Sequence, residues 1–165
     1  MNLLILGAGE LGQVVKEHAQ RTYSKIDFLD DHSAAALAPL AAYRGLKDTY
    51  PDAMVAIGNN EIRMAWIAKL EKAGYNLPSF ISEKAYVSPS ARIAQGCFIE
   101  PMAVVNANAI VEKGSIISAG AIVNHNAVVR EGCHIDCNAV VGAEAVVPEK
   151  TLLTYGQVLK KQFIP

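Results

Sequence analysis

Hydrophobic and polar positions follow two different periods along the chain, and the period changes near Pro78. Before that residue, short apolar runs alternate with amphipathic stretches of helical spacing. The pattern predicts, in order, a strand over Asn2–Leu6, a helix over Gln13–Thr22, strands over Lys25–Asp31 and Ala53–Gly58, and a helix over Asn60–Gly74. Strands that alternate with helices indicate a parallel sheet. Residues 31–51 carry no clear period, and we predict little regular structure there.

From Ile81 onward the hydrophobic period is six residues and does not slip. A bulky aliphatic residue holds the repeat position at Ile81, Val87, Ile93, Ile99, Val105, Val111, Ile117, Val123, Val129, Ile135, Val141, Val147 and Leu153. Four residues after each comes a mostly small side chain, at Ala85, Ala91, Cys97, Ala103, Ala109, Ser115, Ala121, Ala127, Cys133, Ala139, Ala145, Thr151 and Gln157. This pattern is typical of a narrow triangular coil, because the large residue fills the interior and the small one packs where two faces meet.

Residues that tolerate left-handed backbone conformations stand between these positions, at Gly96, Asn108, Gly114, Gly120, Asn126, Gly132 and Asn138. Such residues favour tight corners. With three units per turn, the repeat predicts a left-handed parallel β-helix of a little over four turns. The predicted fold class is an α/β N-terminal half-Rossmann domain over residues 1–78, followed by the β-helix over residues 79–165. The flat outer faces favour self-association, and we expect a homotrimer.

The composition argues against several classes of protein. A net charge of −1 without a basic run disfavours nucleic acid as a partner. No apolar run approaches the roughly 18 residues of a membrane-spanning helix, and the N-terminal "MNLLILGAGELG" lacks the basic start and cleavage site of a signal peptide. Cys97, Cys133 and Cys137 are odd in number and lack paired metal-ligand spacing. We therefore expect a reduced, cytoplasmic protein without a metal, in which Cys97 and Cys133 pack in the interior.

A glycine motif follows the first predicted strand. Gly7, Gly9 and Gly12 form G-x-G-x-x-G between a strand and a helix. There the backbone can approach phosphates at the positive N-terminus of the helix. The alternative is that the glycines only shape a tight turn. The domain is too short for two mononucleotide-binding units, so a single nucleotide or nucleotide-sugar fits better than NAD.

Polar residues end the next two predicted strands. Asp30 and Asp31 close the second strand, and Gly58, Asn59 and Arg63 follow the third. The carboxyl ends of parallel strands share one edge of the sheet, where ligands gather. A carboxylate there can accept hydrogen bonds from a ribose or a base. The alternative is that the two acids are solvated loop residues.

One histidine lies at a predicted corner of the β-helix. His125 stands between two asparagines in "VNHNAVV". An imidazole has an ordinary pKa of about 6.5, which suits a general base near neutral pH. Corners also accept many polar residues, so a solvent-facing role without function is the alternative.

The segments "GAGELGQVV", "FLDD" and "AIGNNEIR", joined to a hexapeptide repeat with "VNHNAVV", resemble a bacterial family over nearly the whole chain. These are the sugar acetyltransferases of the bacillosamine and sialic-acid type, which have a Rossmann-like N-terminal domain. The resemblance implies acetyl-CoA as co-substrate and a UDP-linked amino sugar as acceptor. It implies His125 as catalytic base and His134 in the acetyl-CoA site, with Lys160 near CoA phosphates. It places the nucleotide sugar against Gly7, Gly9, Asp30, Asp31, Gly58 and Asn59.

The chain departs from this family in three places. Family members usually have an acidic residue beside the catalytic histidine, whereas this chain has asparagines on both sides. Family members also often have an asparagine at the corner position where this chain has Ser118. Their β-helix typically runs several turns further, whereas this chain ends in "TLLTYGQVLKKQFIP", which serves either as a CoA-binding segment or as a polar cap. These differences leave open a nucleotide-sugar-binding or regulatory protein that has lost acetyl transfer. A third alternative, an oxidoreductase, depends on the glycine motif alone.

Overall fold

The computed structural model describes residues 1–161. The chain forms two compact units, Met1–Phe80 and a second that begins at Ile81. We had placed the boundary after Pro78, so the two positions differ by two residues. The four final residues of the predicted C-terminal cap lie outside the described part of the chain.

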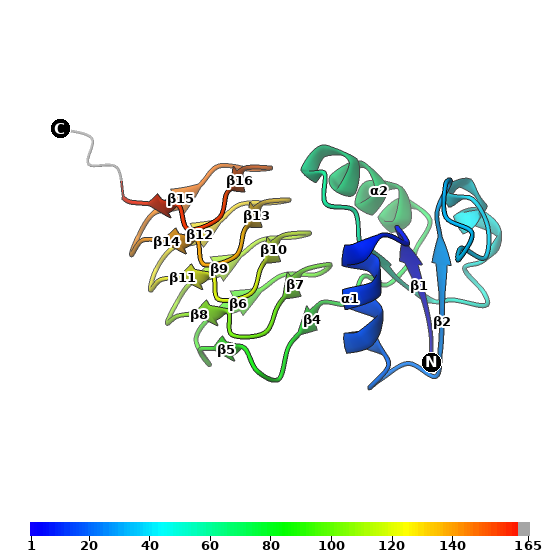
Figure 1. Ribbon diagram of the computed structural model, residues 1–165, viewed down its shortest axis with the longest axis horizontal. Coiled ribbons are helices and arrows are strands. Elements are labelled where there is room, and N and C mark those ends of the chain that lie inside the picture. Colours follow the sequence, from blue (N-terminus) through cyan, green and yellow to red (C-terminus); the bar gives the residue numbers. More distant parts are fainter. Residues whose placement is uncertain (162–165) are drawn as a thin grey trace. The chain divides into compact units, whose positions relative to one another are not determined.

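The first unit contains a parallel sheet of three strands, in the order β2-β1-β3. The strands are β1 (Asn2–Leu6), β2 (Lys25–Leu29) and β3 (Asp52–Val55). Helix α1 (Glu10–Ala19) packs against β1 and β2, and α2 (Asn60–Lys72) packs against β3 (Figure 1). A short 3-10 helix, η1 (Leu40–Gly45), lies in the segment whose hydrophobic positions show no clear period. The sheet brings the ends of all three strands to one edge, as predicted.

Helix α1 begins three residues earlier than the periodicity predicted. Gly9 is its N-cap, so the last four residues of the glycine motif belong to the helix or its cap. The hydrophobic spacing predicted a later first residue because Glu10 and Leu11, which begin the helix, are not among its buried residues. Helix α2 begins at the predicted residue, where Asn59 accepts a hydrogen bond from the Ile62 backbone N–H.

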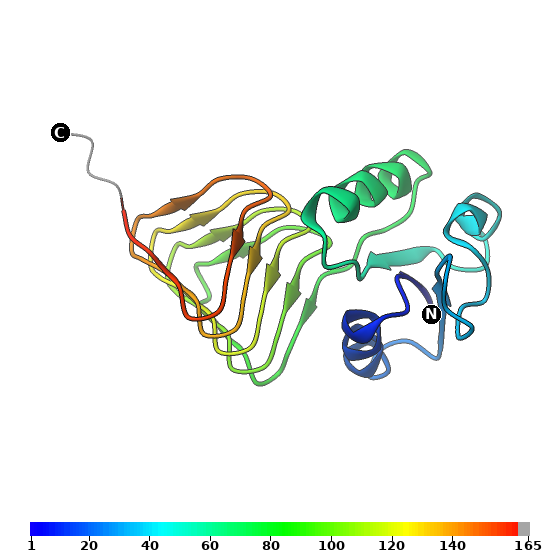
Figure 2. The same cartoon turned by 45° about the horizontal axis from the view of Figure 1, so that its top comes forward.

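The second unit is the predicted β-helix, built from strands of two residues each (Figures 1 and 2). Face 1 consists of β4 (Phe80–Ile81), β7 (Phe98–Ile99), β10 (Ile116–Ile117), β13 (His134–Ile135) and β16 (Leu152–Leu153). Face 2 consists of β5 (Tyr86–Val87), β8 (Val104–Val105), β11 (Ile122–Val123), β14 (Val140–Val141) and β17 (Val158–Leu159). Face 3 consists of β6 (Arg92–Ile93), β9 (Ile110–Val111), β12 (Val128–Val129) and β15 (Val146–Val147).

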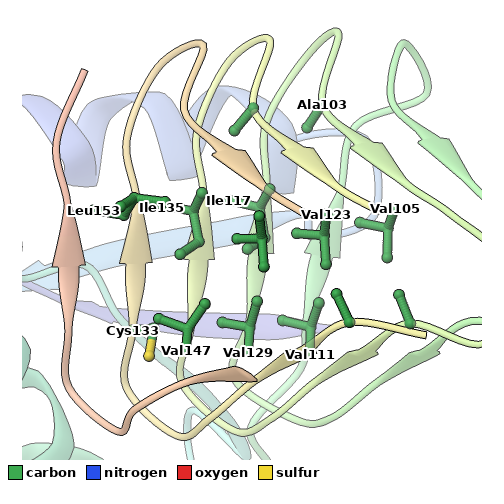
Figure 3. Packing of buried hydrophobic residues seen from close by; sticks show 14 of the residues in the cluster. Ala103, Val105, Val111, Ile117, Val123, Val129, Cys133, Ile135, Val147 and Leu153 are labelled. Atoms are coloured by element: carbon green, nitrogen blue, oxygen red, sulfur yellow. The ribbon is translucent and has the colours of Figure 1, made fainter. Parts of the chain in front are cut away.

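The interior of the β-helix consists of stacked aliphatic side chains. Residues eighteen apart pair in parallel, so that Ile117 lies over Ile99 and under Ile135. Figure 3 shows these rows, with Val111, Val129 and Val147 in line on face 3. The interior repeat positions from Ile99 to Val147 are fully buried. This burial stabilises the fold by about 1.5 to 3 kcal/mol for each side chain.

The corners take the left-handed conformations that the sequence predicted. All seven predicted glycine and asparagine positions have φ between +56° and +70°. Three corners that the sequence did not single out share this conformation without glycine or asparagine: Met102, Glu144 and Lys150. A side chain there carries a conformational penalty of about 1 to 2 kcal/mol.

The repeat loses its interior character at both ends. Ile81, the first repeat position, is 47% exposed, and Gln157, the last small-residue position, is also exposed. Among residues 1–161, neither has a complete neighbouring turn to cover it. Cys97 and Cys133 are fully buried, as predicted, and their thiols contact the backbone oxygens of Glu112 and Pro148 at 3.2 and 2.9 Å. No helix within residues 1–161 is long and apolar enough to cross a membrane.

Candidate functional site

Two glycines of the motif are required by the fold itself. Gly7 has a φ of +104°, and a Cβ there would lie 2.6 Å from the backbone oxygen of Ala56. A Cβ on Gly12 would lie 2.1 Å from the oxygen of Gly7. These positions exclude any side chain because backbone atoms occupy the space. For Gly7 and Gly12, tight packing alone therefore explains the glycine.

Gly9 and Gly58 are different, because a Cβ on either would meet no atom within 4 Å. Both are exposed. Gly9 caps α1 without a side-chain hydrogen bond, so the N-cap side chain satisfies none of the first N–H groups of the helix. Such N–H groups, with the positive end of the helix dipole, favour an anion. The fold does not require glycine at Gly9 or Gly58, and the open space lies at the carboxyl edge of the sheet.

Asp30 ties the glycine motif to the end of β2. Its Oδ2 accepts a hydrogen bond from the Ala8 N–H at 2.8 Å, and its Oδ1 accepts from His32 and Ser33 at 2.8 and 3.1 Å. These backbone N–H groups hold the pKa of the Asp30 carboxyl below its ordinary value. Asp31 accepts one hydrogen bond, from the Leu40 N–H to Oδ1 at 2.9 Å, and is exposed. Asp31 therefore has more capacity than Asp30 to accept hydrogen bonds from a ligand.

Arg63 holds the segment that follows β3. Its Nη1 donates to the oxygens of Ile57 and Gly58, both at 3.0 Å, and its Nη2 donates to Asn60 at 2.7 Å. The side chain is fully buried. The sequence placed Arg63 at this edge, and in the structure it braces the loop that presents Gly58. The Oδ1 of Asn59 caps α2 at 3.0 Å.

A hollow of the first unit lies at the other end of α2. It has a volume of about 490 Å³ and is lined by Tyr43, Arg44, Lys69, Lys72 and Ala73. Lys69 and Lys72 belong to the last turn of α2, where cations stabilise the negative end of the helix dipole. This placement explains the positive charge without a ligand.

His125 lies in the turn between β11 and β12, at the corner between faces 2 and 3. It is exposed, and its backbone N–H donates to Oδ1 of Asn124 at 2.8 Å. Asn126 places its amide nitrogen 3.2 Å from Nδ1 of the ring. A base that uses Nε2 needs its proton on Nδ1 and an acceptor beside it. An asparagine presents either its oxygen or its nitrogen there, so it selects the tautomer less firmly than a carboxylate does.

A hollow of about 390 Å³ lies one turn above this corner. It is lined by Glu144, Ala145, Val146, Pro148, Leu159, Lys160 and Lys161. Glu144 connects the hollow to the histidine, because its backbone N–H donates to the His125 oxygen at 3.1 Å. The structure thus brings two predicted site residues, His125 and Lys160, to the same corner of the β-helix.

His134 lies elsewhere on the β-helix. It is on β13 of face 1, and its Nε2 is 2.9 Å from the hydroxyl of Ser118. In a three-sided coil, the corner between faces 2 and 3 lies opposite face 1. One chain therefore keeps His134 away from His125 and Lys160, although the resemblance placed His134 and Lys160 in one site.

A group of acids that sequence reasoning missed lies near Ser118. Glu100 accepts a hydrogen bond from the Ala119 N–H at 2.9 Å, and Asp136 accepts from the Cys137 N–H at 2.8 Å. Burial, with the charge of Asp136, raises the pKa of Glu100. Burial and the same two carboxylates raise the pKa of the Cys137 thiol. The period of eighteen residues per turn would have grouped Glu100 and Asp136, since they are two turns apart. No three potential ligands gather as a metal site within residues 1–161.

Known proteins are similar to this chain over both of its units. The family described as the PglD N-terminal domain matches residues 2–70. The acetyltransferase domain of PglB from Neisseria gonorrhoeae, solved with acetyl coenzyme A, is 30% identical to this chain. The match covers 97% of this chain and 88% of that one, with a TM-score of 0.81.

Two more distant structures share the fold. A variant of perosamine N-acetyltransferase from Caulobacter crescentus, in complex with CoA and GDP-perosamine, is 23% identical, with 98% and 83% of the chains covered and a TM-score of 0.86. WeeI from Acinetobacter baumannii is 19% identical, with 98% and 90% covered and a TM-score of 0.72.

Proposed function

This chain belongs to the nucleotide-sugar acetyltransferases of the bacillosamine and perosamine type, and on that premise we propose that it transfers the acetyl group of acetyl-CoA to the amino group of a nucleotide-activated sugar, with His125 as general base. The observation that carries the proposal is the corner between faces 2 and 3. There an exposed imidazole lies one turn below a hollow lined by two lysines. An ammonium group is a natural partner for CoA phosphates.

The reaction requires one proton to move. As the sugar nitrogen attacks the thioester carbonyl, a C–N bond forms, and His125 accepts the proton that the nitrogen loses. The C–S bond then breaks, and the sulfur leaves as a thiolate that takes the proton from the imidazolium. His125 is exposed, so an incoming amine can approach its ring.

The nucleotide half of the substrate is assigned to the first unit. The space over Gly9 and Gly58 and the uncapped N-terminus of α1 suit a diphosphate, and Asp31 suits a ribose hydroxyl. A UDP-sugar remains our expectation from the resemblance. The GDP-perosamine bound by the Caulobacter protein makes a GDP-sugar the second nucleotide to test.

A homotrimer is part of the proposal. Within one chain, His134 cannot approach His125, because His134 and its partner Ser118 lie on face 1 and His125 lies at the opposite corner. In the proposed trimer, face 1 of one copy lies beside the corner between faces 2 and 3 of the next copy. Sedimentation equilibrium with the wild-type protein measures the number of copies, and a monomer would remove His134 from the acetyl-CoA site.

The decisive experiment measures CoA thiol release with acetyl-CoA and a panel of UDP- and GDP-linked amino sugars. We expect turnover with at least one sugar and a loss of turnover of at least about a hundredfold in His125→Ala. The His125→Ala variant should bind the nucleotide sugar as tightly as the wild type, as measured by calorimetry. His18→Ala, in the last turn of α1, is the matched control. A His125→Ala variant that retains most of its activity would exclude this residue as the base.

A second candidate function is a nucleotide-sugar-binding or regulatory protein. The observation that favours it is the amide, in place of a carboxylate, beside Nδ1 of His125. Thermal-shift titrations with UDP, GDP and acetyl-CoA separate the two functions. Ligand at 100 times its dissociation constant stabilises a one-site protein by about 2.7 kcal/mol. Stabilisation by a nucleotide but not by acetyl-CoA would favour the binding protein.

A further inference from the structure

The surroundings of His125 contain a carboxylate that the linear sequence does not reveal. The turn that holds the ring contributes Asn124 and Asn126, neither of which carries charge. The turn below, residues 106–109, contains only asparagine and alanine. The turn above, residues 142–145, contains one charged residue, Glu144. Next above it, Lys160 and Lys161 end the described part of the stack.

Glu144 is placed against the histidine by backbone geometry. It lies eighteen residues after Asn126, hence at the same corner position one turn higher. Its N–H donates to the His125 oxygen at 3.1 Å, while Asn126 donates in the same way to Ala107 below at 3.0 Å. The left-handed conformation, with a φ of 59°, is one that asparagine adopts more readily than glutamate. The two residues below it in the stack, Asn108 and Asn126, are asparagines.

The side chain of Glu144 has two cationic neighbours. It forms an ion pair with the ammonium group of Lys161. That ion pair, together with the charge of His125, holds the pKa of the Glu144 carboxyl below its ordinary value. Because electrostatic attraction is mutual, the Glu144 carboxylate attracts a positive charge that forms on the His125 ring during the reaction.

We propose that Glu144 is the positioning residue for His125: its carboxylate, one turn above, balances the imidazolium charge that forms during acetyl transfer, and Lys161 competes with the ring for that carboxylate. The proposal depends on the proposed function, in which His125 is the base. It also links the hollow to the base, because an anion that binds Lys161 leaves the Glu144 carboxylate to the imidazole.

The first test does not require enzymatic activity. Diethyl pyrocarbonate modifies neutral imidazole, and mass spectrometry of the peptide that contains His125 gives the rate at pH 6. Glu144→Gln removes the negative charge, so we expect the rate to rise about twofold, the size of a charge effect through water. Lys161→Met releases the carboxylate and removes a positive charge, so we expect the rate to fall by a similar factor. Glu149→Gln, an exposed acid at the next corner, is the matched control and should not change it.

Glu144→Asn is a second variant that removes the charge, and it should fold at least as well as the wild type because asparagine readily adopts the left-handed conformation of this corner. It should raise the modification rate as Glu144→Gln does. An unchanged rate in both Glu144 variants, or a change in the same direction in Lys161→Met, would overturn the proposal.

The second test uses transfer kinetics. Glu144→Gln should lower kcat about three- to tenfold and move the acid limb of the pH profile of kcat/KM to lower pH. A purely structural role would lower the rate equally at every pH. Adding Asn126→Asp to Glu144→Gln places a carboxylate at the ring again, and we expect it to restore at least half of the lost kcat. If the wild type transfers no acetyl group, the proposed function fails, and the modification rates still decide whether Glu144 acts on His125.

Discussion

Two substitutions distinguish a glycine that the fold requires from one that only a ligand would require. Gly7→Ala tests the first kind of glycine, and Gly9→Ser tests the second. A Cβ on Gly9 would meet no atom within 4 Å, whereas one on Gly7 would lie 2.6 Å from the Ala56 backbone oxygen. Both residues belong to the same motif and lie two positions apart. If the motif binds a diphosphate, only the first substitution should impair binding in a protein that remains folded.

The two substitutions differ in their expected effects on stability. Serine is at least as good an N-cap as glycine, so Gly9→Ser should change the free energy of unfolding by only a few tenths of a kcal/mol, in the stabilising direction. Gly7→Ala forces a side chain into a φ of +104°, at about 1 to 2 kcal/mol. Overlap with a backbone oxygen adds about 1 to 3 kcal/mol. For a unit of 80 residues, each kcal/mol corresponds to roughly 4 to 8 °C in Tm.

The assay pairs thermal unfolding with calorimetric titration of UDP and GDP. We expect Gly9→Ser to melt within about 2 °C of the wild type and to bind the preferred nucleotide at least about tenfold more weakly, which is about 1.4 kcal/mol. Gly7→Ala should melt at least about 8 °C lower. A Gly9→Ser variant that binds nucleotide as tightly as the wild type would show that the open space is not a phosphate site.

Three further outcomes are expected. Val123→Ala removes two methyl groups from the fully buried stack and should lower the free energy of unfolding, measured in urea, by about 2 to 3 kcal/mol. Val146→Ala, at an exposed position, should change this free energy by less than about 0.5 kcal/mol. Equal effects of the two substitutions would contradict the stacking argument. Burial raises the pKa of Glu100 in the folded state, so ionisation of this carboxyl destabilises the fold as the pH rises above its ordinary pKa of about 4.3. Glu100→Gln should therefore raise Tm at neutral pH, and the gain should disappear below about pH 3.5, where the carboxyl is protonated in both states. Lys160→Ala should raise the KM for acetyl-CoA about fivefold with little change in kcat, because it removes an interaction that substrate and transition state share equally. Lys113 pairs with Glu131 at another corner, and Lys113→Ala should change neither KM nor kcat.

The sequence was sufficient for the fold because its pattern is redundant. Each turn of the β-helix repeats the same choice of a large interior residue and a small corner residue, so an error at one position does not change the period. The ends show the limit of that reasoning. Ile81 and Gln157 keep the spacing, but burial also needs a neighbouring turn on both sides, which a period along one chain does not reveal.

The candidate site was less predictable, because its residues meet across turns or through the backbone. The spacing in the first unit placed Asp30 and Asp31 at the correct edge. It did not reveal that Asp30 already accepts three backbone hydrogen bonds while Asp31 accepts one. Likewise, Arg63 was expected at this edge, and its role as a brace for Ile57 and Gly58 follows from the path of its side chain.

In a repeat fold, departures from the repeat are more informative than the repeat itself. Asn108, Asn126 and Glu144 occupy one corner position in successive turns, and all three have left-handed backbone conformations. Asparagine satisfies that conformation with little strain, so a glutamate there reduces stability without improving the packing of the core. Glu144, one turn above Asn126, donates its backbone N–H to the His125 oxygen, and the charge of His125 helps to hold the pKa of its carboxyl below the ordinary value. Local strain that the fold does not need is thus found beside the residue to which we assign the chemistry, as expected where function and stability compete.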